Sequence, residues 1–340
     1  MSLRIAVILG GRSSENPISL ASAASVIEAL ERAGHEVATV QIDRSGSWRL
    51  GAGRRALEPG PESGSAAAVP DRLPPREVAT ALGDVDVVFP VLHGPFGEDG
   101  TVQGLLELAN VPYVGAGVLG SALCMDKDLF KSVLRDNGVP VTRSVTLRSP
   151  GQLENPFGYP VFVKPARLGS SVGITKARTE DELRAGIELA FQHDEKVLVE
   201  EFVDGVEVEC SVLGNEKPIA SIPGEIEANA DWYDYSAKYD EGGMQLVIPP
   251  RISPEATERV QELSVQAFRV TDCEGMARVD CFVLADGEVL INELNTIPGF
   301  TATSVYAKLF EASGIPYEEL LERLVQLALE RYERRAKLRF

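Results

Sequence analysis

A stretch near the C-terminus is predicted to form a β-hairpin that carries two acids on one face. Two apolar runs flank the dipeptide Asp286-Gly287, and this combination is the strongest short-range signal for a hairpin with a two-residue loop. Counting outward from that loop pairs Asp280 with Glu293 and Arg278 with Asn295. Because side chains alternate between the two faces of a strand, these four side chains share one face.

This face predicts a metal site. Directly opposed residues have Cβ atoms about 4.5–5.5 Å apart, so Asp280 and Glu293 repel each other unless a proton or a cation lies between them. The amide oxygen of Asn295 beside them completes a set that suits a hard, oxygen-seeking ion such as Mg²⁺. The alternative interpretation is a solvated face on which Arg278 offsets the two acids.

The composition is that of a soluble globular protein with two or three domains. The 340 residues are 44% hydrophobic and 25% charged, and no apolar run approaches the ~20 residues of a membrane span. The net charge of −18 argues against binding to nucleic acid or to an anionic membrane. A nucleotide site would therefore have to be locally basic or to use metal ions.

The N-terminus and the cysteines favour a cytoplasmic protein. The chain passes directly from Met1 into a strand pattern, without the long apolar segment and cleavage site of a signal peptide. The cysteines at positions 124, 210, 273 and 281 are scattered and match no metal-binding spacing. Buried thiols in a reducing compartment are therefore expected.

The first 120 residues are predicted to form a doubly wound α/β domain with a parallel sheet. Residues Arg4–Leu9 and His35–Ile42 read as buried strands. Between them, Asn16 is expected to cap a helix that has Pro17 at its first position and ends at Ala33. This order of strand, helix and strand is typical of doubly wound sheets.

Two further strands are expected in this domain. Asp84–Leu92 is a third apolar strand, and it runs into the polar glycine loop His93–Gly100. Open α/β sheets bind their ligands at such strand ends. Val111–Gly117 is expected to be the closing strand and an exit turn.

Two lysines in the middle of the chain are candidates for phosphate contacts. Lys164 interrupts the apolar strand Pro160–Pro165, and since an unpaired buried ammonium is costly, it needs an anionic partner. That partner is either a protein carboxylate or a phosphate. The loop Gly169–Gly173 favours phosphate, because glycines let backbone N–H groups approach it and serines add donors. Lys127, on a predicted helix over Met125–Asn137, is in isolation best interpreted as a solvated lysine.

Three later segments are also candidates. Backbone groups beside Phe202 suit an adenine and Glu207 suits a ribose, although a strand edge with surface acids explains them equally well. The tyrosine-rich loop Ala228–Gly243 is interpreted as a lid over an active site. After the hairpin, a hydroxyl run ending at Ser304 either caps the next helix or binds a carboxylate at its N-terminus.

The order of the motifs along the chain carries a resemblance to a known family. The motifs are Ser14-Glu15 after Gly10-Gly11, His93-Gly94 with Gly97–Gly100, Met125-Asp126-Lys127, Lys164-Pro165 before Gly169–Gly173, Tyr233-Asp234-Tyr235 before Lys238-Tyr239, Arg278-Val279-Asp280, and Asn292–Asn295 before Pro298-Gly299. Over essentially its whole length the chain resembles the D-alanine–D-alanine ligases of the ATP-grasp superfamily.

The resemblance implies a three-domain ATP-grasp architecture that combines α/β and α+β parts. The expected domains are an N-terminal α/β substrate domain over 1–120, a central ATP-grasp subdomain over 121–215, and a C-terminal ATP-grasp subdomain over 216–340 with the lid at 228–243 and the metal hairpin at 276–295. The implied reaction joins two D-alanine molecules through an acyl phosphate made with ATP, for peptidoglycan precursor synthesis. Two Mg²⁺ or Mn²⁺ ions and a homodimer are also implied, and a monovalent cation is left open.

The resemblance implies a role for each candidate residue. Phosphate contacts would come from Lys127, Lys164 and Lys238, adenine and ribose contacts from Glu200, Val203 and Glu207, and metal contacts from Asp280, Glu293 and Asn295. Arg278 and the backbone of Gly299 would stabilise the tetrahedral oxyanion. Glu15 would bind the ammonium of the first D-alanine in a network with Ser170 and Tyr239. Ser304 would bind the carboxylate of the second D-alanine.

One segment departs from the family pattern. After Glu15 the chain reads Asn16-Pro17-Ile18-Ser19, where relatives commonly have His or Arg followed by Glu-Val-Ser. The difference bears on the geometry of the first D-alanine site and not on the reaction. The pair Lys238-Tyr239 matches the dipeptide-forming members rather than the D-alanine–D-lactate relatives.

Two alternatives stay open, and a third is excluded. The first is an ATP-grasp carboxylate–amine ligase with another acceptor, such as lactate or serine. The second is a non-catalytic nucleotide-binding protein, which should have lost a metal ligand or Arg278, whereas all of these residues are present. A dinucleotide-dependent oxidoreductase is excluded, because Gly10–Ser14 lacks the Gly-x-Gly-x-x-Gly fingerprint.

Overall fold

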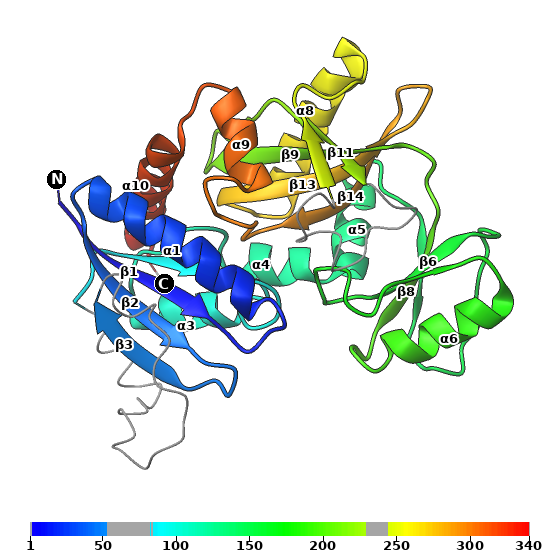
Figure 1. Ribbon diagram of the computed structural model, residues 1–340, viewed down its shortest axis with the longest axis horizontal. Coiled ribbons are helices and arrows are strands. Elements are labelled where there is room, and N and C mark those ends of the chain that lie inside the picture. Colours follow the sequence, from blue (N-terminus) through cyan, green and yellow to red (C-terminus); the bar gives the residue numbers. More distant parts are fainter. Residues whose placement is uncertain (1, 53–81, 83, 229–243, 340) are drawn as a thin grey trace.

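The computed structural model describes residues 2–52, 82, 84–228 and 244–339, and Figure 1 shows how they are arranged. Within these residues the strands form three separate sheets. They are called here the N-terminal sheet, the small sheet and the large sheet, in the order in which the chain enters them. The candidate site lies where the small and large sheets meet.

The N-terminal sheet is covered by helices on both faces. Its elements are β1 (Arg4–Gly10), α1 (Asn16–Arg32), β2 (Glu36–Ile42), β3 (Trp48–Ala52), β4 (Val87–Val91) and α3 (Thr101–Ala109). In the order β3-β2-β1-β4, β1 is parallel to β2 and β4, and β3 is antiparallel to β2. Alternate residues of β1 share one core with α1 and another with α3, so the two helices cover opposite faces. The predicted doubly wound α/β arrangement is therefore confirmed.

Two expectations for this part are wrong in detail. Asn16 is the first residue of α1 rather than its cap, and its side-chain amide donates to a carbonyl of the preceding loop at 2.8 Å. The described segment Val111–Gly117 is not a strand, since it contributes a single bridge, from Tyr113 to β4. Pro112 has no N–H to donate, and Gly115 turns the chain with a φ of 96°, so the pairing does not extend.

The small sheet is antiparallel and has one covering helix. The elements of this part are α4 (Val118–Met125), α5 (Lys127–Asp136), β5 (Ser144–Leu147), β6 (Val161–Pro165), β7 (Thr175–Ala177), α6 (Glu180–Ala190) and β8 (Val197–Glu201). The strand order is β5-β8-β6-β7, and α6 packs on the sheet to form its core. The helix predicted to begin at Met125 begins at Lys127. Asp126 separates it from α4 and caps it by accepting from the Leu129 N–H at 3.2 Å.

The large sheet is built by the C-terminal part of the chain. Its elements are β9 (Val206–Gly214), β10 (Ile219–Ala220), β11 (Gly224–Ala228), β12 (Met244–Val247), α8 (Pro254–Val270), β13 (Gly275–Val283), β14 (Val289–Asn295), α9 (Val305–Ala312) and α10 (Tyr317–Ala336). The order is β12-β11-β9-β13-β14, with β10 beside β9. Helix α8 shares a core with one face, and α9 and α10 share a core with the other.

The chain changes sheets between β8 and β9. Strand β8 is hydrogen-bonded in the small sheet, whereas β9 is paired with β13 along its whole length. The limit expected at residue 215 for the central subdomain therefore falls after β9, on the far side of a strand that belongs to the large sheet. Residues 202–205, which connect the two sheets, form part of the candidate site.

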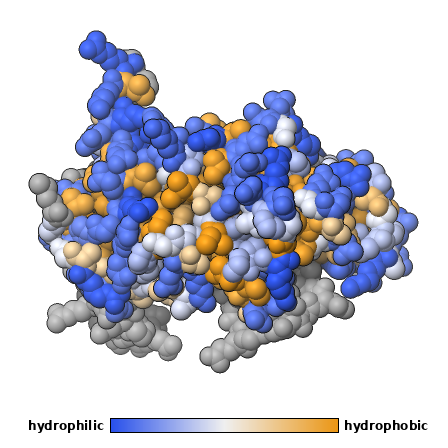
Figure 2. All heavy atoms as spheres, turned by 90° about the horizontal axis from the view of Figure 1, so that it is seen from above, coloured by the Kyte–Doolittle hydropathy of each residue, from blue (hydrophilic) through white to orange (hydrophobic). Residues whose placement is uncertain are grey.

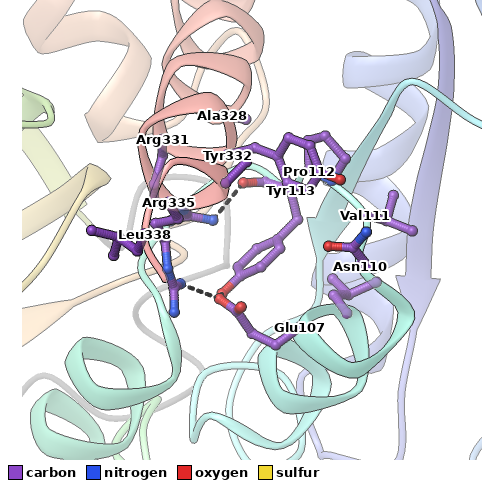
Figure 3. A pocket seen from close by; sticks show the side chains of 12 residues that line it. Glu107, Asn110, Val111, Pro112, Tyr113, Ala328, Arg331, Tyr332, Arg335 and Leu338 are labelled. Carbon is purple, nitrogen blue, oxygen red and sulfur yellow. Dashed lines mark hydrogen bonds and ion pairs between the residues drawn. The ribbon is translucent and has the colours of Figure 1, made fainter. Parts of the chain in front are cut away.

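Helix α10 ties the C-terminal part to the N-terminal sheet. Its apolar face shares a core with α1, β1 and β4. Near its end, the buried guanidinium of Arg331 donates to the carbonyl of Tyr113 at 2.7 Å and to the carbonyl of Gly115. Arg335 forms an ion pair with Glu107 at the edge of a cavity of about 400 Å³ (Figure 3). These contacts fix the N-terminal sheet relative to the large sheet.

The surface and the cysteines agree with the composition. Hydrophilic residues cover much of the face shown in Figure 2, and apolar residues lie between them in small groups. The four cysteines are buried free thiols, as expected. Among the helices of the described residues, none has the length and apolar character needed to span a membrane.

Candidate active site

A cavity of about 260 Å³ lies between the small and large sheets and gathers most of the residues expected to bind a nucleotide. The expected residues that line it are Lys127, Lys164, Ser170, Glu200, Val203, Glu207 and Glu293. The lining contains three lysines and five carboxylates in all, so it is not locally basic. Of the two possibilities raised by the acidic composition, this lining favours metal ions as the balance for polyphosphate.

Lys127 is buried at the start of α5 and lines the cavity. Its ammonium donates to the Leu168 carbonyl at 3.0 Å and lies 3.2 Å from a carboxylate oxygen of Glu293. Its backbone N–H donates to the Ala166 carbonyl at 3.0 Å. The interpretation of Lys127 as a solvated lysine is therefore wrong, because the loop after β6 and the hairpin both fold over it.

Lys164 has the protein carboxylate partner that its buried position required, and it also lines the cavity. Its ammonium donates to Glu200, and Lys131 donates to the other oxygen of the same carboxylate. Lys131 additionally donates to the hydroxyl of Thr142. Lys131 was not predicted. The available signal was its position four residues after Lys127 on the same helix, next to the apolar Phe130.

The charges of this cluster shift one another's pKa values. Burial raises the pKa of Glu200, but Lys131 and Lys164 outweigh it and lower the pKa to about 2. Burial is the largest influence on Lys131 and lowers its pKa to about 8 against the attraction of Glu200. Burial also lowers the pKa of Lys164, but Glu200 and more distant acids raise it above its ordinary value. Glu200 is thus ionised throughout the neutral range.

Aromatic rings beside the strand connection also line the cavity. The rings of Phe162 and Phe202 lie 6.3 Å apart, and the ammonium of Lys176 lies 4.3 Å from the centre of the Phe202 ring. Val203 and Glu207 line the same region. Phe162 and Lys176 were not predicted, because each stands on its own in the sequence without a motif around it.

The hairpin has the predicted pairing at its polar end and a different loop. Asp280 faces Glu293 and Arg278 faces Asn295, as predicted. The connection is longer than two residues, however, since Leu284 donates to the Glu288 carbonyl at 2.8 Å.

A β-bulge restores the predicted register between the loop and the polar end. Asp280 faces Glu293 but Cys281 faces Ile291, so Asn292 is the extra residue of β14. Because of the bulge, both Asn292 and the adjacent Glu293 line the cavity. Strict alternation would have sent Asn292 to the opposite face.

Arg278 holds the carboxylates of the large sheet together. Its Nε lies 2.7 Å from Oδ1 of Asp280 and 2.9 Å from a carboxylate oxygen of Glu209. Asn295 donates to Asp280 at 3.1 Å. Burial opposes the charge of Arg278, but Asp280 and Glu209 raise its pKa further above its ordinary value. Glu209, on the neighbouring strand β9, was not predicted.

The donor set on the hairpin fits a divalent cation. Asp280 and Glu293 supply carboxylate oxygens and Asn295 an amide oxygen, which are the donors that hard cations prefer. Each carboxylate has a cationic neighbour in this structure, Arg278 and Lys127 respectively. Among the described residues, no cluster of three or more His, Cys, Asp or Glu side chains is close enough to hold a metal ion, so any site here combines the two carboxylates with other oxygen donors.

Loops of the N-terminal sheet reach the same region. Ser170 donates to the buried carboxylate of Glu15, which brings these two predicted residues together. The third member of the expected network, Tyr239, lies outside the described residues, as does Lys238. Gly94 has a φ of 72°, and a Cβ atom there would overlap a carboxylate oxygen of Glu15. A glycine is therefore required where the loop 93–100 passes Glu15.

Two unpredicted residues of this loop hold the segment before Gly299. His93 is buried, and its Nδ1 lies 2.9 Å from the Ile297 carbonyl. Glu98 accepts from the Ile297 N–H at 2.9 Å. The motif that contains both residues was recognised in the sequence, but its contact with a segment about two hundred residues later has no local signal.

Gly299 and Ser304 lie together at the start of α9. Ser304 occupies the cap position, yet its hydroxyl makes no capping bond and instead accepts from the Thr301 N–H at 3.0 Å. A Cβ atom on Gly299 would lie 3.4 Å from that hydroxyl. The interpretation of Ser304 as an ordinary side-chain cap is therefore wrong.

Comparison with known proteins gives the same family along the whole chain. A family model described as D-ala D-ala ligase N-terminus matches residues 4–116, and one described as D-ala D-ala ligase C-terminus matches residues 133–326. A D-alanine–D-alanine ligase of Oceanobacillus iheyensis is 42% identical over 360 aligned positions, covering 100% of this chain and 98% of the relative.

Solved structures agree with the sequence match. The D-alanine–D-alanine ligase from Coxiella burnetii has a TM-score of 0.83 and 37% identity, with 99% of this chain and 96% of that chain covered. The VanG D-Ala:D-Ser ligase from Enterococcus faecalis has a TM-score of 0.84 and 39% identity, with 96% and 100% covered. With the fold, the family models and the relatives in agreement, the chain belongs to the D-alanine–D-alanine ligase family, the ATP-dependent ligases of peptidoglycan synthesis.

Proposed function

We propose that this chain joins two D-alanine molecules into D-alanyl-D-alanine and that it holds ATP in the cavity between the small and large sheets. The observation that carries this location is the ion pair of Lys127 and Glu293, which lie 3.2 Å apart and both line the cavity. A cation suited to phosphate and a carboxylate suited to a metal ion thus adjoin the same space. ATP and a divalent metal ion are what the family uses.

The reaction needs ATP because a carboxylate is a poor acyl donor. The γ-phosphoryl group of ATP moves to a carboxylate oxygen of the first D-alanine, which gives ADP and an acyl phosphate. The amine of the second D-alanine attacks the acyl carbon and gives up a proton, and inorganic phosphate leaves as the peptide bond forms. Phosphoryl transfer depends mainly on positioning and on neutralisation of charge.

The nucleotide contacts come from the lining of the cavity. Lys127 and Lys164 contact the phosphates, since both are buried lysines that line the cavity. Glu200, Val203 and Glu207 contact the adenine and the ribose. Lys238 is proposed for the phosphates on the resemblance alone.

Asp280, Glu293 and Asn295 hold the divalent ions, which we propose to be two Mg²⁺ or Mn²⁺ ions. When bound, such ions neutralise charge on the phosphates. Arg278 and Lys127 supply positive charge beside the carboxylates of Asp280 and Glu293.

The amino-acid substrates bind between the N-terminal loops and the start of α9. Glu15, held by Ser170, binds the ammonium of the first D-alanine, and Tyr239 completes this network on the resemblance alone. Arg278 and the N–H of Gly299 stabilise the oxyanion of the tetrahedral adduct. Ser304 binds the carboxylate of the second D-alanine beside the N-terminus of α9, where the helix dipole favours an anion.

The remaining expectations concern organisation and setting. We propose the three domains expected from the sequence, with the limit between the central and C-terminal subdomains moved to residues 202–205, where the chain changes sheets. We also propose a cytoplasmic homodimer that binds neither nucleic acid nor membrane, in keeping with the net charge of −18.

An enzyme assay with several acceptors tests this proposal. Enzyme, ATP and Mg²⁺ are incubated with D-alanine, with L-alanine, and with D-alanine plus D-serine or D-lactate, and the products are identified by mass. D-alanyl-D-alanine with equimolar phosphate is expected from D-alanine alone, and none from L-alanine. The likeness to a D-Ala:D-Ser ligase makes D-serine the most relevant competing acceptor.

Two outcomes would contradict the proposal. A mixed product that exceeds D-alanyl-D-alanine at equal acceptor concentrations would favour a ligase with a different acceptor. Nucleotide binding without turnover would favour a non-catalytic protein. Glu293→Gln is the control for phosphate release by the unaltered enzyme. It keeps the shape of the side chain but removes the charge of the proposed metal ligand, so it should abolish phosphate release.

A further inference from the structure

Three lysines and two glutamates form ion pairs beside the cavity. Lys127 pairs with Glu293, while Lys131 and Lys164 both donate to Glu200. In the described part of the chain, these ion pairs contain three lysines and two carboxylates, so one positive charge is in excess. Buried carboxylates require a positive partner, so the question is which lysine serves Glu200 and which is left to act on a ligand.

The two lysines on Glu200 differ in their access to the cavity. The Lys164 side chain is 10% exposed and lines the cavity, whereas the Lys131 side chain is 1% exposed and lies behind Glu200. Lys131 has two acceptors, Glu200 and Thr142. Lys164 has Glu200 and a long contact of 3.4 Å to Asn292. Of the two ammonium groups, that of Lys164 is the one placed to meet a phosphate.

We infer that Lys131 is a positioning residue for ATP: it neutralises Glu200 from behind, so that the positive charge of Lys164 remains available to the phosphates. Without Lys131, Lys164 would be the only cation paired with Glu200 in the described part of the chain, and this pair would present no net charge to a phosphate. Two unit charges interact strongly at such separations in a buried site. The low pKa of Glu200, about 2, agrees with a carboxylate that carries two cations.

This inference deepens the proposed function, because it rests on Lys164 facing the nucleotide phosphates. It also separates Lys131 from a purely structural lysine. A structural lysine would affect the binding of every part of the nucleotide together, through loss of fold. A charge-balancing lysine affects the phosphates and leaves the nucleoside alone.

The test compares the affinities of ADP and adenosine, measured by calorimetry in the presence of Mg²⁺. The readout is the dissociation constant of adenosine divided by that of ADP. This ratio isolates the contribution of the phosphates to binding. Lys131→Met is expected to reduce this ratio about tenfold, since it removes one charge from the balance behind the phosphate site. Thr142→Val, which removes an acceptor of Lys131 without changing the charges, should leave the ratio within about twofold of the unaltered protein.

A double variant makes the test decisive. Lys131→Met with Glu200→Gln removes one charge of each sign, so Lys164 again carries the surplus charge, and the ratio should return to within about threefold of the unaltered protein. Any direct contact of Glu200 with adenine appears in the adenosine affinity and cancels from the ratio. If Lys131→Met does not fold, as judged by circular dichroism, the double variant and Thr142→Val still give the comparison.

Two results would overturn the inference. One is an unchanged ratio in Lys131→Met, with ADP and adenosine weakened alike. The other concerns the double variant. If Lys131→Met folds, a ratio for the double variant as low as that of Lys131→Met contradicts the inference. If Lys131→Met does not fold, a ratio for the double variant more than about threefold below that of the unaltered protein contradicts it. Failure of the proposed function is distinguished by the unaltered protein itself, which would then bind ADP without forming D-alanyl-D-alanine.

Discussion

The guanidinium of Arg278 is bonded to both carboxylate oxygens of Asp280, with Nε 2.7 Å from Oδ1 and Nη2 2.6 Å from Oδ2. The two residues are two positions apart on β13 and therefore share a face. The planar fork of an arginine matches a carboxylate in this bidentate way, and the ammonium of a lysine does not. The proposed oxyanion donor is thus oriented by the proposed metal ligand beside it.

This pairing predicts that Arg278→Lys folds but loses most of its activity. The lysine keeps a positive charge beside Asp280 and Glu209, but it cannot hold the fork geometry, so D-alanine-dependent phosphate release should fall by about 100-fold or more. Arg278→Ala should in addition lower the free energy of unfolding by roughly 3–5 kcal/mol, because it leaves buried carboxylates without their cation.

Phosphate release and urea denaturation measure the two effects. Arg323→Lys is the control, since Arg323 forms an exposed ion pair with Glu319 on α10, and it should change stability by less than about 0.5 kcal/mol. Near-normal phosphate release by Arg278→Lys would refute the role given to the guanidinium.

The polar end of the hairpin shows what sequence reasoning supplies and where it stops. Counting outward from a two-residue loop pairs Asp280 with Glu293, and the structure confirms that pairing because the bulge compensates for the longer loop. Alternation could not supply Asn292, because it assumes a regular strand and Asn292 enters the cavity through a bulge. In the N-terminal part, the first three parallel strands follow from their apolar runs, whereas the short bridge at Tyr113 was mistaken for a strand.

Three residues of the candidate site were not predicted from the sequence for the same physical reason. Lys131, Glu209 and His93 each act through a partner far away in the sequence: Glu200, Arg278 and Ile297 respectively. A lysine on a helix and a glutamate on a strand have no local mark that distinguishes a buried partner from solvent. Such contacts follow from the packing of the sheets and not from spacing along the chain.

Asn292 is predicted to support the binding of ATP. Its amide oxygen lies 3.4 Å from the ammonium of Lys164, and this contact fixes one side of the lysine. Asn292→Leu should raise the KM for ATP by about three- to tenfold, the cost of one weak hydrogen bond to a charged group, and should change the KM for D-alanine less. Steady-state kinetics with each substrate varied gives both values. Glu288→Gln, at the exposed tip of the same hairpin, should leave both KM values unchanged. An unaltered KM for ATP in Asn292→Leu would show that the contact between Asn292 and Lys164 does not contribute to ATP binding.

Gly94 is predicted to be essential for the first D-alanine site. An alanine there would overlap the carboxylate of Glu15 and would hold a φ of 72° that L residues rarely adopt. Gly94→Ala should therefore raise the KM for the first D-alanine by about tenfold or more while leaving ADP affinity nearly unchanged.

A second glycine provides the matched control for this change. Gly104 lies in α3. Among the described residues, and apart from the backbone of its own helix and its chain neighbours, no heavy atom lies within 4 Å of the position that a Cβ would take there. Gly104→Ala should therefore stabilise the protein by about 0.5–1 kcal/mol and leave the KM for D-alanine unaltered. Steady-state kinetics with D-alanine varied and thermal denaturation distinguish the two variants. If Gly94→Ala also left the KM for D-alanine unaltered, Glu15 would have no part in binding that substrate.

His93 is predicted to make the fold sensitive to acid near neutral pH. Burial lowers its pKa below the ordinary value of 6.5, against the opposing charge of Glu15. Its Nε2 has no hydrogen-bond partner among the residues that the structure describes, so a proton there is poorly accommodated. Because the unfolded chain binds this proton more readily than the folded one, the contribution of His93 to stability is complete above pH 6.5. It is lost as the pH falls below that value, by at most about 1.4 kcal/mol per pH unit.

Urea denaturation between pH 7.5 and about 5 measures this loss by comparing variants. Glu98 raises the stability as the pH falls over this range, because burial raises its pKa to about 8. Glu98 is present in every variant compared. His93→Gln, which keeps an amide able to donate to the Ile297 carbonyl but does not titrate, should lose less stability than the unaltered protein across that range. His193→Gln, at an exposed histidine, should follow the unaltered protein. Parallel curves for all three would mean that His93 binds its proton equally well in the folded and unfolded states, and that its burial beside the Ile297 segment carries no electrostatic cost.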